Sequence, residues 1–241
     1  MNHLKVLRIA CYGIFLLSLT HTNCGVDEDL ADGSCQTLAD SIALTEREAL
    51  FFDLTINEEP RGDVSRLRKW NGQINLFLEG VLSQDQFNEV NDVVTEINSL
   101  SSFIEIVLVD NVESSNLRFF FGTREDYIAL FGPNVPVIPD GNNGLVNIAR
   151  DSSFEIKEAS IWIDNVNFPD FEFQQHFIRE QIARSLGLVN DITSFDDSIF
   201  HETINTNISY SELDQEMIAL MLGGVLRPGF CPNTILKAIE E

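Results

Sequence analysis

The sequence has little positive charge and few histidines. Its 241 residues include 15 Lys and Arg, 38 Asp and Glu and only 4 His, which gives a formal net charge of −23. A chain this acidic repels nucleic acid, so we expect no nucleic-acid partner. The sequence also lacks a glycine-rich phosphate loop and a Gly-x-Ser-x-Gly elbow, which argues against the common nucleotide-binding and serine-hydrolase patterns.

Long apolar runs are also lacking, and the one notable run lies at the N-terminus. It extends from Ile9 to Leu19, which is too short to cross a bilayer comfortably because a crossing takes about 20 apolar residues. Lys5 and Arg8 precede the run. A short positive segment followed by such a run is typical of an export signal.

The segment after this run, from Thr20 to Gly25, contains Cys24 and resembles the end of a bacterial lipoprotein signal. In that family the cysteine after the apolar run is acylated and becomes the mature N-terminus. The resemblance implies a signal peptide over residues 1–23, a lipid on Cys24 that attaches the chain to a membrane, and a place in the bacterial cell envelope, facing the periplasm or the cell surface. Cleavage and secretion without a lipid is the alternative.

The rest of the chain divides into a polar tether over residues 24–45 and a single domain over residues 46–241. Two cysteines remain in it, Cys35 and Cys231, one near each end. In an oxidising compartment they form a disulfide that ties the ends together, or they are two unrelated thiols. The sequence leaves both open, because the geometry decides.

Apolar periodicity predicts an α+β domain in which one twisted, mixed sheet packs on helices. The predicted strands cover residues 73–79, 103–109, 117–121, 145–149 and 159–163, and the predicted helices cover 45–52, 83–100, 124–131, 170–188 and 211–222, with a short helix at the end. The clearest helix begins at Ser83, with Gln86 placed for a capping box. Its expected buried stripe is Phe87, Val90, Val94, Ile97 and Leu100.

Residues 179–191 contain the most informative pattern. In zinc peptidases of the zincin type, two histidines four residues apart bind zinc and a glutamate between them is the general base. A Leu-Gly-Leu sequence often follows, and here Leu186-Gly187-Leu188 stands in the same frame. The segment therefore resembles a degenerate zincin motif. Its positions are Glu180 for the first histidine, Gln181 for the glutamate, Arg184 for the second histidine, Gly187, and Asn190 for the third ligand of the longer metzincin pattern.

These substitutions remove the chemistry of the motif. Arginine stays protonated in proteins and cannot bind a metal, and glutamine cannot act as a base. Glu180 and Arg184 are spaced for an ion pair along the helix that would occupy the place of the zinc. The alternative is that both side chains face solvent.

The wider chain resembles an uncharacterised bacterial family, domain of unknown function (DUF) 2927, which looks related to the zincins. The resemblance covers roughly residues 67–236. It depends on Trp70, the strands at 74–80 and 159–164, Glu180 with Leu186-Gly187-Leu188, residues 190–191 and 210–214, and the turn at 226–229. It implies a zincin-like fold whose long helix carries the degenerate motif, and it implies no established activity.

Other sites remain possible from the residues alone. His176, Glu180 and His201 could share zinc in a metal-dependent hydrolase that acts as a peptidase. Asp191, Asp196 and Asp197 could hold calcium. An exposed edge along residues 159–164 could bind an extended peptide, as the edge strand does in zincins.

We therefore expect a non-catalytic envelope lipoprotein whose domain is a binding or structural module for an unknown protein or peptide. The loss of both histidines and the base, with Leu186-Gly187-Leu188 kept, is the reason. No cofactor is expected, and zinc belongs only to the hydrolase alternative.

Overall fold

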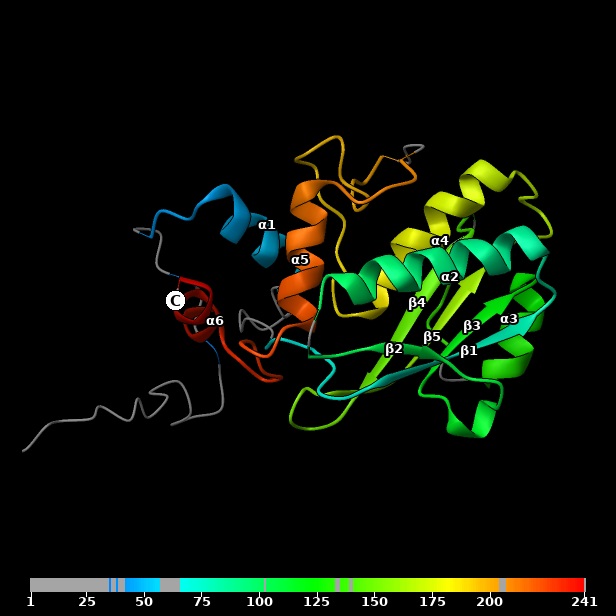
Figure 1. Cartoon of the computed structure of the whole chain (residues 1–241), viewed down its shortest axis with the longest axis horizontal. Helices are drawn as coiled ribbons and strands as arrows, with labels where there is room; N and C mark the ends of the chain where they lie inside the picture. Colours follow the sequence, from blue (N-terminus) through cyan, green and yellow to red (C-terminus); the bar gives the residue numbers. More distant parts are fainter. Residues whose placement is uncertain are drawn as a thin grey trace, which may run out of the picture.

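The fold is built on a mixed sheet of five strands (Figure 1). The computed structural model describes residues 35, 38, 42–56, 66–101, 103–132, 135–138, 141–203 and 207–240. The strand order is β2-β1-β3-β5-β4. The strands are β1 (Ile74–Gly80), β2 (Ile106–Leu108), β3 (Leu117–Phe121), β4 (Gly144–Arg150) and β5 (Ile156–Ile163). Strands β2, β1, β3 and β5 run parallel, and β4 runs antiparallel to β5 at the edge.

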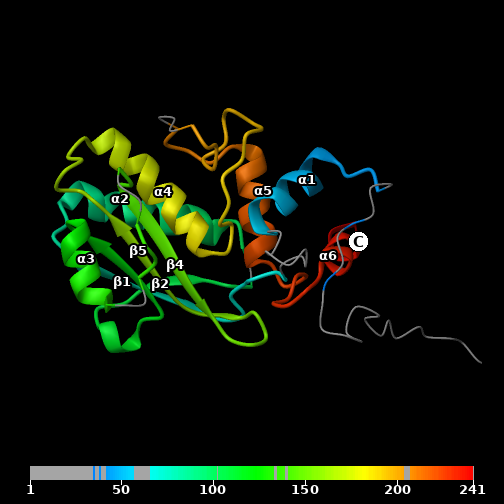
Figure 2. The same ribbon diagram turned by 180° about the vertical axis from the view of Figure 1, so that it is seen from behind.

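Helices cover both faces of the sheet and one of its ends (Figure 2). Helices α2 (Gln84–Ser99) and α4 (Phe171–Ser185) lie side by side on one face, and the short helix α3 (Arg124–Phe131) lies on the other. A single 3₁₀ turn, η2 (Val112–Ser114), precedes β3. Helices α1 (Glu46–Thr55), α5 (Glu212–Leu222) and α6 (Pro232–Glu240) gather beyond one end of the sheet. The prediction of an α+β domain with a mixed sheet is therefore confirmed.

The alternation along β3 shows how the sheet separates two cores. Leu117, Phe119 and Phe121 are almost fully buried in the large core beneath α2 and α4. Phe120 points the other way and packs with Tyr127 of α3 and with Trp162 of β5. Because successive side chains of a strand point to opposite faces, this short strand contributes to both cores.

Capping residues fix where three of the helices begin. Thr45, Ser83 and Ser211 each accept a hydrogen bond from the backbone three residues on, and each forms a capping box. Such boxes satisfy backbone donors that a helix start leaves free. The predicted start of α2 at Ser83 is thereby confirmed. The place of Phe87 in its buried stripe is wrong, since Phe87 is 43% exposed and Val93 is buried instead.

The strand expected at an open edge lies inside the sheet. The segment around Ala159 belongs to β5, which pairs with β3 on one side and with β4 on the other. It therefore has no free edge for a peptide, and that prediction is wrong. The edge on this side of the sheet is β4. Strand order depends on pairing between distant segments, which the local pattern of β5 does not encode.

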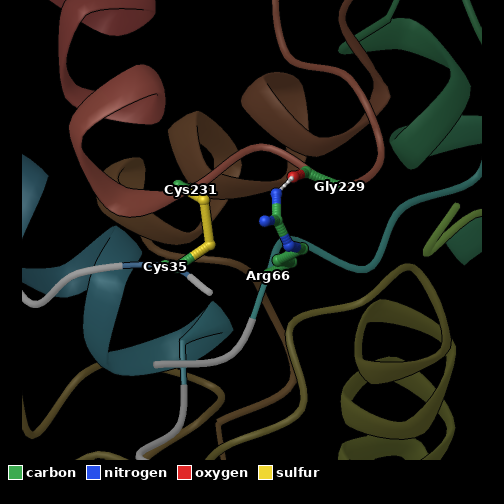
Figure 3. The surroundings of a disulfide bond; sticks show 4 residues. All are labelled: Cys35, Arg66, Gly229 and Cys231. Atoms are coloured by element: carbon green, nitrogen blue, oxygen red, sulfur yellow. Dashed lines mark hydrogen bonds between the residues drawn. A yellow bond between two sulfur atoms is a disulfide. The ribbon is translucent and has the colours of Figure 1, made fainter. Parts of the chain in front are cut away.

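A disulfide joins the two ends of the domain (Figure 3). It links Cys35 to Cys231, whose Cα atoms are 5.4 Å apart, just before α6. Arg66 lies close by and donates a hydrogen bond of 3.0 Å to the carbonyl oxygen of Gly229. Both cysteines are buried, and Leu38 packs against the large core. The range predicted as a tether therefore includes residues that are attached to the domain.

The predicted signal peptide and Cys24 lie outside the described residues. Within the described part of the chain, no helix is long and apolar enough to span a membrane.

Candidate functional site

The segment that resembles a degenerate zincin motif borders a cavity of about 430 Å³ between helix α4 and the edge strand β4. The loop before β4 and the segment after α4 complete its wall. Two histidines, several charged residues and several apolar residues line the cavity. The histidines are His176 and His201, the charged residues are Glu180, Arg184, Asp191 and Glu202, and the apolar residues are Leu145, Val146, Phe177 and Val189. The cavity thus collects most of the residues that the sequence singled out.

Helix α4 presents these side chains because its opposite face is held in the core. Asp170 caps its start by accepting from the backbone N–H of Glu172. Ile178 and Ile182 are fully buried beneath it. Side chains three and four residues apart share one face of a helix, so the intervening positions His176, Glu180 and Arg184 turn toward the cavity.

Gly187 follows the end of helix α4 and turns the chain. Its φ angle is +114°, a region that favours glycine. A Cβ atom at this position would lie 2.5 Å from the carbonyl oxygen of Arg68. The chain therefore turns sharply here, and Val189 donates its N–H to the Leu54 carbonyl oxygen of α1 at 2.9 Å. This turn brings the following residues back beside the cavity.

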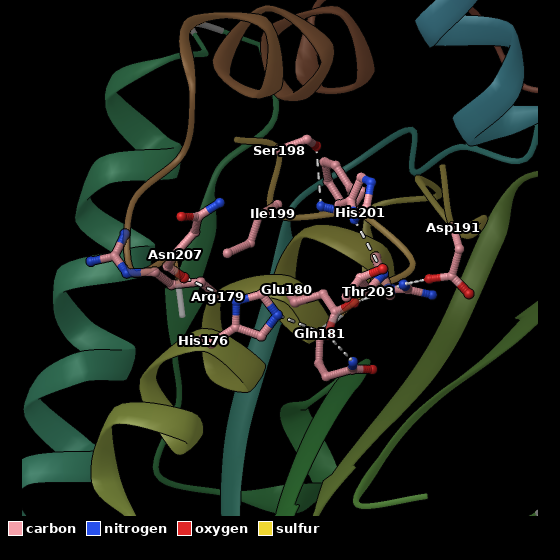
Figure 4. A network of polar contacts seen from close by, with 12 residues as sticks. His176, Arg179, Glu180, Gln181, Asp191, Ser198, Ile199, His201, Thr203 and Asn207 are labelled. Atoms are coloured by element: carbon pink, nitrogen blue, oxygen red, sulfur yellow. Dashed lines mark hydrogen bonds and ion pairs between the residues drawn. The ribbon is translucent and has the colours of Figure 1, made fainter. Parts of the chain in front are cut away.

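The Glu180 carboxylate is held by two neighbours on its own helix (Figure 4). Its Oε1 accepts from Arg184 Nη2 at 2.7 Å and from Arg184 Nε at 3.1 Å, and its Oε2 accepts from Gln181 Nε2 at 3.0 Å. Arg184 also pairs with Asp191 and donates to the Val189 carbonyl oxygen. Glu180 and Arg184 form an ion pair along the helix, and both line the cavity.

Arg184 stays charged in this setting. Burial lowers the pKa of its guanidinium, but the carboxylates of Glu180 and Asp191 more than offset that effect, so the pKa is raised above its ordinary value. Because the guanidinium cannot lose its proton, it cannot offer a lone pair to a metal. The position that holds the second histidine in the zincin motif is therefore permanently cationic.

The two histidines near the cavity have different surroundings. His176 is 2% exposed, and its Nδ1 lies 2.9 Å from the carbonyl oxygen of Asn207. Its Nε2 faces Glu180 Oε2 at 3.9 Å. His201 lies within its own loop, where its Nε2 is 3.5 Å from Asp196 and its Nδ1 accepts from the Thr203 N–H.

The metal sites considered from the sequence are not assembled. Among the residues that the structure describes, no group of three or more His, Cys, Asp or Glu side chains is placed to hold a metal ion. Asp191 is bonded to Arg184, and Asp196 faces His201 with its side chain fully exposed. Asn190, the third-ligand position, donates to the Asp53 carbonyl oxygen at 2.7 Å and does not line the cavity. The donor set does not fit zinc.

The described domain coincides with a match to a known protein family. The family described as "Protein of unknown function (DUF2927)" matches residues 45–241. The chain belongs to the DUF2927 family. The match runs from the N-cap Thr45 of α1 to the end of the chain, and is longer at both ends than the resemblance over residues 67–236. No curated protein matches the chain.

The DUF2927 domain also contains a network of charged side chains around Arg179 that the sequence does not indicate. Arg179 of α4 lies 2.8 Å from Glu89 and 2.6 Å from Glu96, both on α2, and its carbonyl oxygen accepts from the Tyr210 hydroxyl at 2.8 Å. These contacts hold α4 against α2. They therefore help to set which side chains of α4 point into the cavity. No local pattern signals this network, because Arg179 is more than 80 residues from Glu89 and Glu96 and 31 residues from Tyr210.

Proposed function

We propose that this DUF2927 chain is an exported, lipid-anchored envelope protein whose zincin-like domain is a non-catalytic binding module. One observation carries the proposal. The Glu180 carboxylate is bonded to Arg184 and Gln181 at the three positions where a zincin has its histidines and general base. An ion pair and an amide therefore stand where zinc chemistry would need a metal and a base.

The position of the cavity supports a zincin-like scaffold. The helix with Leu186-Gly187-Leu188 forms one wall, and the edge strand β4 forms another. A helix with the metal motif beside an edge strand that binds extended peptide is the arrangement that the zincin resemblance implies. The resemblance and the geometry point to the same cavity.

Strand β4 supports an extended peptide as the ligand. Among the described strands it pairs with β5 alone, which leaves residues 144–146 at the edge of the sheet for pairing with an added strand. Gly144, Leu145 and Val146 of β4 line the cavity. Peptides recognised by strand addition gain affinity from main-chain hydrogen bonds and specificity from pockets for alternate side chains. The cavity would be one such pocket.

The disulfide supports export, because disulfides persist in oxidising compartments and are rare in the cytosol.

Lipidation at Cys24 accounts for the N-terminal pattern of charge, apolar run and cysteine. The intact mass of the chain purified from membranes tests whether Cys24 is lipidated. We expect an N-terminus at Cys24 with attached acyl chains; an unmodified N-terminus elsewhere would contradict lipidation and leave secretion.

Restoring the motif tests whether the scaffold is zincin-like. The variant E180H/Q181E/R184H is expected to bind one zinc, because both histidines would face the cavity beside Asp191, which becomes free of Arg184. Zinc binding is measured by competition with a chromogenic chelator, and folding is checked by circular dichroism.

The matched control is Q84H/N88H, which places two histidines four residues apart on the exposed face of α2. We expect the restored motif to bind zinc at least about tenfold more tightly than this pair, because Asp191 lies beside the two histidines at the cavity as a third ligand. A folded restored variant that binds zinc no better than the control would contradict the zincin-like assignment.

A further inference from the structure

The DUF2927 cavity contains two acceptor atoms that face each other without a donor between them. His176 Nδ1 lies 2.9 Å from the Asn207 carbonyl oxygen, so Nδ1 carries a proton, and the tautomer with a single ring proton has its lone pair on Nε2. Nε2 has no hydrogen-bond partner in the described part of the chain. It lies 3.9 Å from Glu180 Oε2, which is too far for a hydrogen bond. His176 is 2% exposed and borders the cavity.

The charge of the cavity favours a cation between these two atoms. Three carboxylates and one guanidinium line it, from Glu180, Asp191, Glu202 and Arg184. With both histidines neutral, these groups leave two negative charges uncompensated. Buried lone pairs and charges without partners are costly, and a ligand that supplies both donors and positive charge would satisfy them.

The spacing distinguishes an ammonium group from zinc. A nitrogen placed about 2.9 Å from both acceptors, which are 3.9 Å apart, sees them at an angle of about 85°. Two N–H bonds of a tetrahedral ammonium reach both with small bends. A zinc ion about 2.1 Å from each would need an angle of about 136°, which departs from tetrahedral by about as much as the ammonium angle does, but zinc coordination holds to tetrahedral geometry more strictly than hydrogen bonds hold to linearity. The Arg184 guanidinium bonded to Glu180 would also repel a dication more strongly than a monovalent ion.

The cavity wall matches the rest of a lysine side chain. Val146, Phe177 and Val189 provide apolar surface next to the acceptor pair. Lysine buries its methylene stem against such surface while its ammonium reaches polar groups. We propose that the cavity binds a lysine side chain of an extended peptide, with its ammonium between His176 Nε2 and Glu180 Oε2. This inference rests on the proposed function, in which the peptide pairs with β4.

The test is binding of capped heptapeptides to the full chain in detergent, measured by fluorescence polarisation. The probe alternates threonine and valine around a central lysine, and matched peptides carry norleucine or acetyl-lysine at the centre. A fourth has no lysine and a free N-terminal amine. We expect the lysine peptide to bind at least about tenfold more tightly than the other three.

Equal binding of the lysine and norleucine peptides would overturn the inference and leave the proposed function standing. Preference for the free amine would move the ammonium from a lysine to an N-terminus, and would overturn the choice of lysine.

Two variants separate the ammonium site from a structural effect. His176→Asn keeps an N–H near the position of Nδ1 for the Asn207 carbonyl oxygen and removes Nε2, so it should abolish the lysine preference and give the lysine and norleucine peptides equal affinity. Glu172→Gln removes an exposed carboxylate on the same helix outside the cavity and should keep the preference.

If no peptide binds, the proposed function fails, and the inference is tested alone with n-butylammonium followed by nitrogen NMR of the His176 ring. A saturable shift supports the ammonium site, and no shift overturns it. Stoichiometric zinc binding through His176 in the unaltered chain would also overturn it.

Discussion

Replacing both Cys35 and Cys231 with alanine is expected to lower the free energy of unfolding by about 3–5 kcal/mol. The bridge spans 196 residues, so it restricts nearly the whole unfolded domain. Closing a longer loop removes more conformational entropy from the unfolded state, which puts this bridge at the upper end of the usual range. For a domain of this size the loss corresponds to a fall in the melting temperature of about 10 °C.

Thermal and urea unfolding of C35A/C231A against the unaltered chain measure this effect. Alanine avoids leaving an unpaired thiol or hydroxyl at two buried positions. Reductant should destabilise the unaltered chain to a similar degree and leave the variant unchanged. A variant as stable as the oxidised chain would show that the bridge does not restrict the unfolded state.

Lys69 is a buried lysine without a carboxylate partner in the described part of the chain. Its side chain is 1% exposed, and Nζ makes one hydrogen bond, of 3.3 Å, to the Trp70 carbonyl oxygen. Burial lowers the pKa of this ammonium from 10.5 to about 8. Because the folded pKa lies below the unfolded one, the folded state binds the proton less tightly. Stability should therefore rise as the pH increases from about 8 to 10.5, and the penalty is fully present below pH 8.

Lys69→Met is expected to stabilise the protein at pH 7 by about 2 kcal/mol. The pKa difference corresponds to about 3 kcal/mol, from which the lost hydrogen bond must be subtracted. The advantage of the variant should shrink as the pH rises toward 10. Urea unfolding at several pH values measures both effects.

Lys157→Met is the matched control, because Lys157 is half exposed and pairs with Glu155 and Asp151. It should give no such gain at pH 7. If Lys69→Met destabilised the protein at pH 7, or if its effect did not depend on pH, the ammonium of Lys69 would not carry the penalty assigned to it.

Much of the fold follows from local chemistry that the sequence displays. The capping boxes at Ser83 and Ser211 and the left-handed Gly187 mark helix ends through hydrogen bonds within a few residues. Strand β3 and helix α3 have the bounds that apolar and polar periodicity predicts. These features are readable because the interactions that create them are short in sequence.

Features that depend on distant partners were not readable. Nothing in the alternation of β5 indicates that β4 folds back and covers its edge. Lys69 follows Arg66, Leu67 and Arg68, a run that looks like solvated surface, yet its side chain is buried. Such outcomes are decided by tertiary packing, which overrides local preference.

Part of the candidate site could be predicted from the sequence. The spacing of Glu180, Arg184 and Gly187 indicated the motif, and the structure places Glu180 and Arg184 at one cavity and Gly187 at the turn beside it. The direction of side chains after the turn was not readable. Asn190 points to α1 and Asp191 takes the place beside the cavity, because the backbone of the turn is bonded to Leu54.

The zinc content of the full chain, purified without chelator, tests the central claim most directly. That claim is that Arg184, Glu180 and Gln181 occupy the place of a metal and a base. We predict no stoichiometric transition metal by elemental analysis, and a melting temperature that added zinc does not change. One zinc per chain, lost in His176→Asn, would contradict the account and favour a hydrolase that uses His176, Glu180 and His201.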